Sequence, residues 1–94
     1  MSYAEFKASL SGDTPPHLPP PLLGLWYDAK GDWDKAHQTV QQDDSADSAW
    51  VHAYLHRKEG DLSNAHYWYR RAGKPPFTGS LEREWEQIAQ ALLE

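Results

Sequence analysis

Apolar side chains recur at helical spacing near the end of the chain. They follow an i, i+4, i+7, i+8, i+11 pattern, at Leu81, Trp85, Ile88, Ala89 and Leu92. This spacing places them on one face of a helix, and the intervening residues are mostly Glu, Arg and Gln. Ser80 stands where its hydroxyl can cap the first turn. The pattern predicts an amphipathic helix within residues 79–94, whose apolar face covers the second of two helical hairpins predicted below.

A second apolar stripe runs along residues 32–42, where Trp33, Ala36, His37 and Val40 share one helical face. A single histidine on such a stripe is more often a hydrogen-bonded core residue than a ligand. We therefore expect His37 to be partly buried among apolar neighbours.

The N-terminal segment contains a helix start followed by a helix stop. Ser2 and Glu5 form the S-x-x-E pattern of a capping box, which predicts a short helix that ends near Gly12. Residues 13–21 then contain five prolines, which exclude a helix and favour an extended segment. Two interpretations stay open: this Pro-rich strap packs the first helix across the rest of the chain, or it is a ligand for an aromatic groove on a partner.

The same two-residue turn occurs twice, as Gly31-Asp32 and Gly60-Asp61, and helical patterns flank it both times. Glycine adopts the left-handed conformation that ends a helix, and Asp accepts hydrogen bonds from the free N–H groups of the next helix. Each turn therefore predicts a helix-turn-helix hairpin with a positive φ at its glycine. Gly73, followed by Pro75 and Pro76, marks the end of the second hairpin.

The first hairpin resembles a tetratricopeptide repeat. The match covers the L-G-x2-Y pattern and the later Gly and Ala, at Leu23, Gly24, Tyr27, Gly31 and Ala36. In the second hairpin, Ala53, Ala65 and Ala72 stand at small-residue positions of the repeat, whereas His52 and His56 replace the expected Leu and Tyr. The two Gly-Asp turns are 29 residues apart, against a repeat period of about 34. The resemblance is thus to a degenerate, tetratricopeptide-like pair.

Together these patterns predict an all-α, single-domain chain of two stacked tetratricopeptide-like hairpins. The expected parts are an N-terminal helix in 1–12, the Pro-rich strap in 13–21, hairpin 1 in 21–43, hairpin 2 in 45–73 and a capping helix in 79–94. Repeat arrays need such a terminal helix to cover an apolar end. The same helix could instead form a dimer seam.

Composition narrows the possible functions. The net charge of −5 disfavours nonspecific nucleic-acid binding, and the lack of cysteine excludes disulfides and thiolate chemistry. No apolar run approaches the roughly 20 residues of a membrane span, and no basic and apolar leader is present. We therefore expect a cytoplasmic protein, a monomer or weak homodimer, that binds no membrane and needs no cofactor.

The leading functional prediction is a non-enzymatic module that binds a peptide or partner protein. The resemblance implies that the first helix of each hairpin lines a binding face, and the matching positions are Trp50, Tyr54, Arg57 and Lys58, with Leu25 and Asp28 on the earlier hairpin. Two rings beside two cations suit an acidic peptide. On this hypothesis, reversing the charges of Arg57 and Lys58 weakens partner binding and leaves the fold intact. In the alternative interpretation, Trp50 and Tyr54 belong to the core.

The alternative function is metal binding, in a metalloprotein or metalloenzyme. His52, His56 and Glu59 lie at i, i+4 and i+7, and His66 on the next helix could add a fourth ligand. The zinc-protease pattern H-E-x-x-H is absent because Ala53 stands where its Glu would be. Packing between helices is the competing interpretation of the two histidines.

Overall fold

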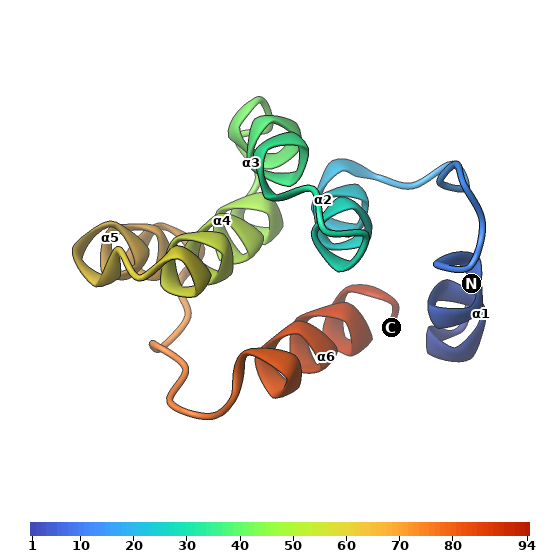
Figure 1. Ribbon diagram of the computed structural model, residues 1–94. Helices are drawn as coiled ribbons and strands as arrows, with labels where there is room; N and C mark the ends of the chain where they lie inside the picture. Colours follow the sequence, from blue (N-terminus) through green and yellow to red (C-terminus); the bar gives the residue numbers. More distant parts are fainter.

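Local helix signals account for the secondary structure. The computed structural model describes residues 1–94 and contains no strand. The helices are α1 Tyr3–Ser9, α2 Pro20–Ala29, α3 Trp33–Gln41, α4 Ala46–Glu59, α5 Leu62–Ala72 and α6 Leu81–Leu92 (Figure 1). The all-α prediction is confirmed. None of these helices has the length and apolar character needed to cross a membrane.

Side-chain caps fix where the helices begin, except for α2, which begins at Pro20 and has no side-chain cap. The capping box of Ser2 and Glu5 is present, and Ser80 accepts a hydrogen bond from the backbone N–H of Arg83. Asp32 and Asp61 accept from backbone N–H groups at the starts of α3 and α5. These bonds satisfy donors that have no partner within the helix.

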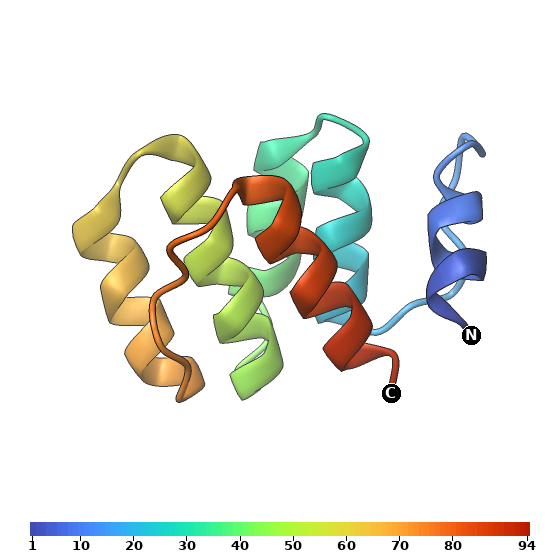
Figure 2. The same ribbon diagram turned by 90° about the horizontal axis from the view of Figure 1, so that it is seen from below.

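Left-handed glycines fix where helices end. Gly31 and Gly60 have φ values of 86° and 90°, and Gly73 has a φ of 70°. The predicted positive φ at both turn glycines is confirmed. Each turn lets the chain reverse, so that α2 packs against α3 and α4 packs against α5 (Figure 2).

Helix α4 is the centre of the molecule. It contacts α2, α3, α5 and α6, and the nine consecutive residues from Ser48 to His56 are all buried. The largest fully buried apolar side chains of the protein are Trp26, Tyr69, Phe6, Leu25, Leu55 and Ile88. A helix buried on all sides has no polar face, so its polar residues must find partners within the protein.

Helix α6 covers more of the protein than predicted. It packs against both α4 and α2, and therefore spans both helix pairs instead of covering only the second (Figure 2). The indole Nε1 of Trp85 donates to the backbone oxygen of Leu25 on α2 at 3.0 Å. The segment 73–80 lets α6 return across the bundle, where its apolar face meets the first helix of each pair.

Helix α1 is held by a few side-chain contacts. Phe6 is fully buried and stacks on Trp85 with ring centroids 5.7 Å apart. Trp26 Nε1 donates to Ser9 Oγ at 3.1 Å. Lys30 Nζ donates to the backbone oxygens of Leu10 and Gly12, at 2.7 and 2.9 Å. These bonds place α1 beside α2 and α6.

Gly60→Ala should destabilise the protein by about 1–2 kcal/mol, because a residue with a Cβ is strained in the left-handed conformation. A Cβ at Gly60 would meet nothing within 4 Å, so the cost reports strain without a steric clash. Chemical denaturation measures it. Gly12→Ala is the matched control, since Gly12 has no positive φ and its added Cβ would meet only ordinary contacts. Equal stability of the two variants would contradict the argument.

Candidate functional site

A buried carboxylate on α2 binds two side chains of α4. Asp28 is 3% exposed. Its Oδ2 accepts a hydrogen bond from the hydroxyl of Tyr54 at 2.8 Å, and its Oδ1 lies 2.9 Å from Nζ of Lys58. Burial, together with the neighbouring Asp28 charge, raises the pKa of Tyr54 well above its ordinary value. The Tyr54 hydroxyl therefore stays protonated and donates to the carboxylate.

A second buried carboxylate joins three helices. Glu84 of α6 is 1% exposed, and its Oε1 accepts from Nη1 of Arg57 on α4 at 2.8 Å. Its other oxygen accepts from the hydroxyl of Tyr69 on α5. Arg57 also donates to the backbone oxygen of Gly79. Burial and the bond to Glu84 raise the pKa of Tyr69, which keeps this hydroxyl a donor.

These contacts correct the predicted partner-binding surface. Trp50, Tyr54, Leu25 and Asp28 are exposed by only 6, 3, 0 and 3%. They are covered because α6 packs on the two helices that carry them. The structure thus places Trp50 and Tyr54 in the core, as in the alternative interpretation.

The two predicted cations also have internal partners. Arg57 and Lys58 are bound to Glu84 and Asp28, so they are not a free basic patch for an acidic peptide. Reversing Arg57 to Glu would place a second carboxylate beside buried Glu84. We therefore replace the expectation that this substitution leaves the fold intact: the substitution should destabilise the fold, because an unpaired buried charge is strongly destabilising.

Part of the predicted surface does line an open groove. The largest groove on the protein, about 590 Å³, lies between α1 and α6, and Tyr54, Asp28 and Lys58 contribute to it. Its other side chains come from α1, α2 and α6, and they are Tyr3, Lys7, Leu10, Ala29, Leu81, Glu82, Trp85 and Glu86. This volume is within the range of about 300–1,000 Å³ typical of ligand sites.

The groove has more negative than positive groups. Asp28, Glu82 and Glu86 face Lys7 and Lys58, and the Lys58 charge is already bound to Asp28. Glu82 and Glu86 are exposed, lie one turn apart on α6 and have no ion-pair partner. Glu82 lies in the first turn of α6, where its charge favours the helix dipole, but it stands at i, i+4 to Glu86 and the two like charges repel each other.

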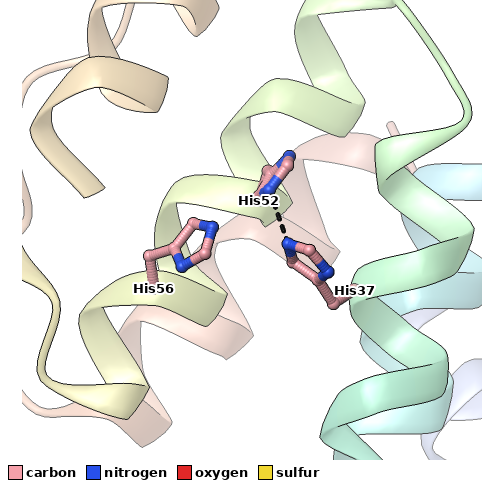
Figure 3. A group of neighbouring side chains, drawn as sticks. All are labelled: His37, His52 and His56. Atoms are coloured by element: carbon pink, nitrogen blue, oxygen red, sulfur yellow. Dashed lines mark hydrogen bonds between the residues drawn. The ribbon is translucent and has the colours of Figure 1, made fainter. Parts of the chain in front are cut away.

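On the α3 side of α4, three histidines form a cluster. His37 of α3 and His52 and His56 of α4 each place a ring nitrogen within 4.8 Å of those of the other two (Figure 3). The Nε2 atoms of His52 and His37 are 3.0 Å apart, and Nδ1 of His56 lies 2.6 Å from Oε1 of Glu59. The i, i+4 spacing therefore brought the two α4 histidines together as predicted.

The third member of the cluster differs from the sequence hypothesis. His66 is exposed and outside the cluster, whereas His37 completes it. The signal was available, because His37 lies on the same stripe as Ala36 and Val40, which pack inward. What the sequence did not reveal is that this stripe faces the histidine side of α4.

Flat side chains enclose the histidine cluster. Trp33 stacks on His37 with ring centroids 5.0 Å apart, and Trp68 of α5 stacks on His52 at 3.8 Å. Burial, with the neighbouring His37 and His56, lowers the pKa of His52 from 6.5 to about 3. Burial also lowers the pKa of His37. His52 is therefore a neutral ring at physiological pH.

A comparison of the chain with known protein families, with curated proteins and with solved structures finds no match. Any functional conclusion therefore depends on the chemistry of the groove and of the histidine cluster.

The buried ion pair between Arg57 and Glu84 gives a stability prediction. Arg57→Leu should cost about 3–5 kcal/mol, because it leaves a buried carboxylate without its cation. Adding Glu84→Gln removes that charge and keeps an acceptor for Tyr69, so the double variant should recover much of the loss. Urea denaturation measures both. Arg70→Leu is the control, since Arg70 is exposed and has no ion pair. If the stability losses of Arg57→Leu and Glu84→Gln simply add in the double variant, the two residues are not a coupled pair.

The lowered pKa of His52 predicts a loss of stability in mild acid. The unfolded chain takes up a proton at this ring near the ordinary value of 6.5, whereas the folded chain does so only at about 3. The free energy of unfolding should therefore decrease as the pH falls below 6.5, by up to about 1.4 kcal/mol per pH unit. Denaturation between about pH 5 and 6.5, with a chelator present, measures the slope. The slope should be smaller in His52→Gln, and identical slopes would contradict this origin.

Proposed function

We propose that the protein is a small, non-enzymatic interaction module built from two tetratricopeptide-like hairpins, α2–α3 and α4–α5. The near-identity of the two turns supports this. The cap residues that follow the left-handed glycines, Asp32 and Asp61, have φ and ψ of −109° and 78°, and −93° and 79°. Similar backbone geometry at equivalent positions is what a structural repeat requires.

Close packing at the repeat positions supports the same proposal. A Cβ on Gly24 would lie 2.6 Å from Cγ1 of Val40, so only glycine fits between α2 and α3 at this point. Ala36 and Ala65, at equivalent places in the two hairpins, are both fully buried. The small residues of the motif thus stand where helices approach closely.

Because of where α6 lies, the binding site that we propose is at the edge of the two hairpins and not on the face of α2 and α4. In longer arrays of this type, the first helices of the hairpins line a concave face. Here α6 lies against those helices, α2 and α4. The largest accessible concavity is the groove between α1 and α6, which keeps Tyr54 and Lys58 from the predicted surface.

The occupant we propose is a basic segment of a partner protein, with Arg or Lys side chains. The observation that carries this proposal is the pair of unpaired carboxylates, Glu82 and Glu86, beside aromatic walls. A guanidinium or ammonium group could bond to both carboxylates and lie against the rings. The net charge of −5 would steer such a partner toward the protein.

The protein's own Lys7 illustrates the chemistry of this groove. Its Nζ lies 5.6 Å from the ring centroid of Trp85 and 6.0 Å from that of Tyr3. A cation is thus accommodated between these rings already. A partner's cation could take a similar position next to Glu82 and Glu86.

A fluorescent peptide of alternating Arg and Gly tests the proposal by anisotropy. It should bind at low salt, and a peptide of alternating Glu and Gly should not. Glu82→Gln with Glu86→Gln should weaken binding by about tenfold or more, because charge-assisted hydrogen bonds contribute about 1.5–3 kcal/mol each. The stability of this variant should change little, since both side chains are exposed.

The matched control has the same change in net charge away from the groove. Asp34→Asn with Asp44→Asn removes two exposed carboxylates that do not line it, and should reduce peptide binding only slightly. Equal losses in the two double variants would mean that binding follows net charge alone. That result, or binding of the Glu peptide, would refute the proposed site.

A further inference from the structure

Three imidazoles from two different helices converge on one point between α3 and α4. His52 and His56 are one turn apart on α4, and His37 reaches them from α3 (Figure 3). One ring nitrogen from each lies within 4.8 Å of the others. His17 and His66, the remaining histidines of the chain, are exposed and outside the cluster.

The separations are close to those of a metal site. Zinc binds imidazole nitrogen at about 2.0–2.1 Å, so two ligands of a tetrahedral site are about 3.3 Å apart. The Nε2 atoms of His37 and His52 are 3.0 Å apart, and the largest separation in the cluster is at most 4.8 Å. An ion bound here would replace the hydrogen bond between the two Nε2 atoms, and the proton of that bond would move to Nδ1 of the same ring or to solvent.

Glu59 supplies the orienting bond that histidine ligands usually have. Its Oε1 lies 2.6 Å from Nδ1 of His56. A proton held at Nδ1 by this carboxylate leaves Nε2 with a free lone pair. Figure 3 shows one ring nitrogen of His56 turned toward the other two rings. A carboxylate behind a ligating histidine fixes its tautomer and increases its basicity.

The surroundings of the cluster leave one side open. Trp33 and Trp68 stack on His37 and His52 and hold these rings in place. His37 itself is only half-buried, so part of this side chain is accessible from outside. Three protein ligands with an accessible fourth position are the arrangement of catalytic and exchangeable zinc sites rather than of closed structural ones.

We propose that His37, His52 and His56 bind a divalent transition metal of the kind that imidazole favours, with zinc as the best fit. The ion would join α3 to α4 and so connect the two hairpins. Glu59 acts as the orienting residue behind His56. His37 replaces His66 in the ligand set that the sequence suggested. This site is independent of the groove, because Tyr54 and Lys58 lie on the other side of α4.

Cobalt(II) titration of the 94-residue protein, first stripped of metal with a chelator, tests the site. Binding should saturate at one ion per chain, with the visible absorption of tetrahedral cobalt, and zinc should displace it. His37→Gln should weaken binding by about 100-fold or more, since it removes one of three ligands. Glu59→Gln should weaken it by about 10–100-fold, as for other orienting partners. His17→Gln with His66→Gln is the matched control and should bind as the unaltered protein does.

A second measurement needs no substitution, and so holds even if His37→Gln fails to fold. On zinc addition, the ring signals of three histidines should shift in the NMR spectrum, and those of His17 and His66 should not. Absence of saturable cobalt or zinc binding would overturn the proposal. So would shifts at His17 or His66 instead, or full binding by folded His37→Gln. None of these results bears on peptide binding in the groove, so the two proposals fail separately.

Discussion

The structure depends on the buried carboxylate of Glu84. A carboxylate with 1% exposure is tolerated only if cations and donors surround it, and here Arg57 of α4 and Tyr69 of α5 supply them. Because Glu84 needs both partners, α6 must lie against α4, and the Tyr69 hydroxyl of α5 must point toward this carboxylate. Asp28 imposes the same condition between α2 and α4, through Tyr54 and Lys58. Apolar burial alone would allow several arrangements of the helices. These two networks favour the one arrangement in which both buried carboxylates have their partners.

Helix α4 can be buried on all sides because its polar groups are paired in this way. No buried side-chain nitrogen or oxygen in the structure lacks a hydrogen-bond partner. Its tyrosine and cations face the carboxylates of α2 and α6, and its histidines face α3 and the ring of Trp68. Helix α4 is therefore the core of the protein and presents no open face to solvent along residues 48–56. Under the proposed function, recognition would take place at the edge of the bundle, where the groove between α1 and α6 is open.

Features set by neighbouring residues could be predicted from the sequence, and features set by distant contacts could not. Gly60 and Ser80 act through bonds to residues a few positions away, so their roles follow from the sequence and are confirmed. The burial of Trp50 depends on where α6 lies, and this is decided by contacts such as Trp85 with Leu25, 60 residues apart. The pairing of His52 with His56 follows from helical spacing. To predict that His37 joins this pair, one would need to know how α3 and α4 are rotated relative to each other, and the local sequence pattern does not give this orientation.

The two sites share α4 but should not influence each other strongly. Residues 52 and 56 lie roughly half a turn around the helix from residues 54 and 58, so each site meets a different face. Coupling between them would require α4 to have a second arrangement that one ligand favours. The networks at Asp28 and Glu84 oppose any shift of α4, because movement would separate buried charges from their partners. A metal bound by the histidines would therefore add rigidity between the hairpins, and the groove would keep its shape whether or not the metal is bound.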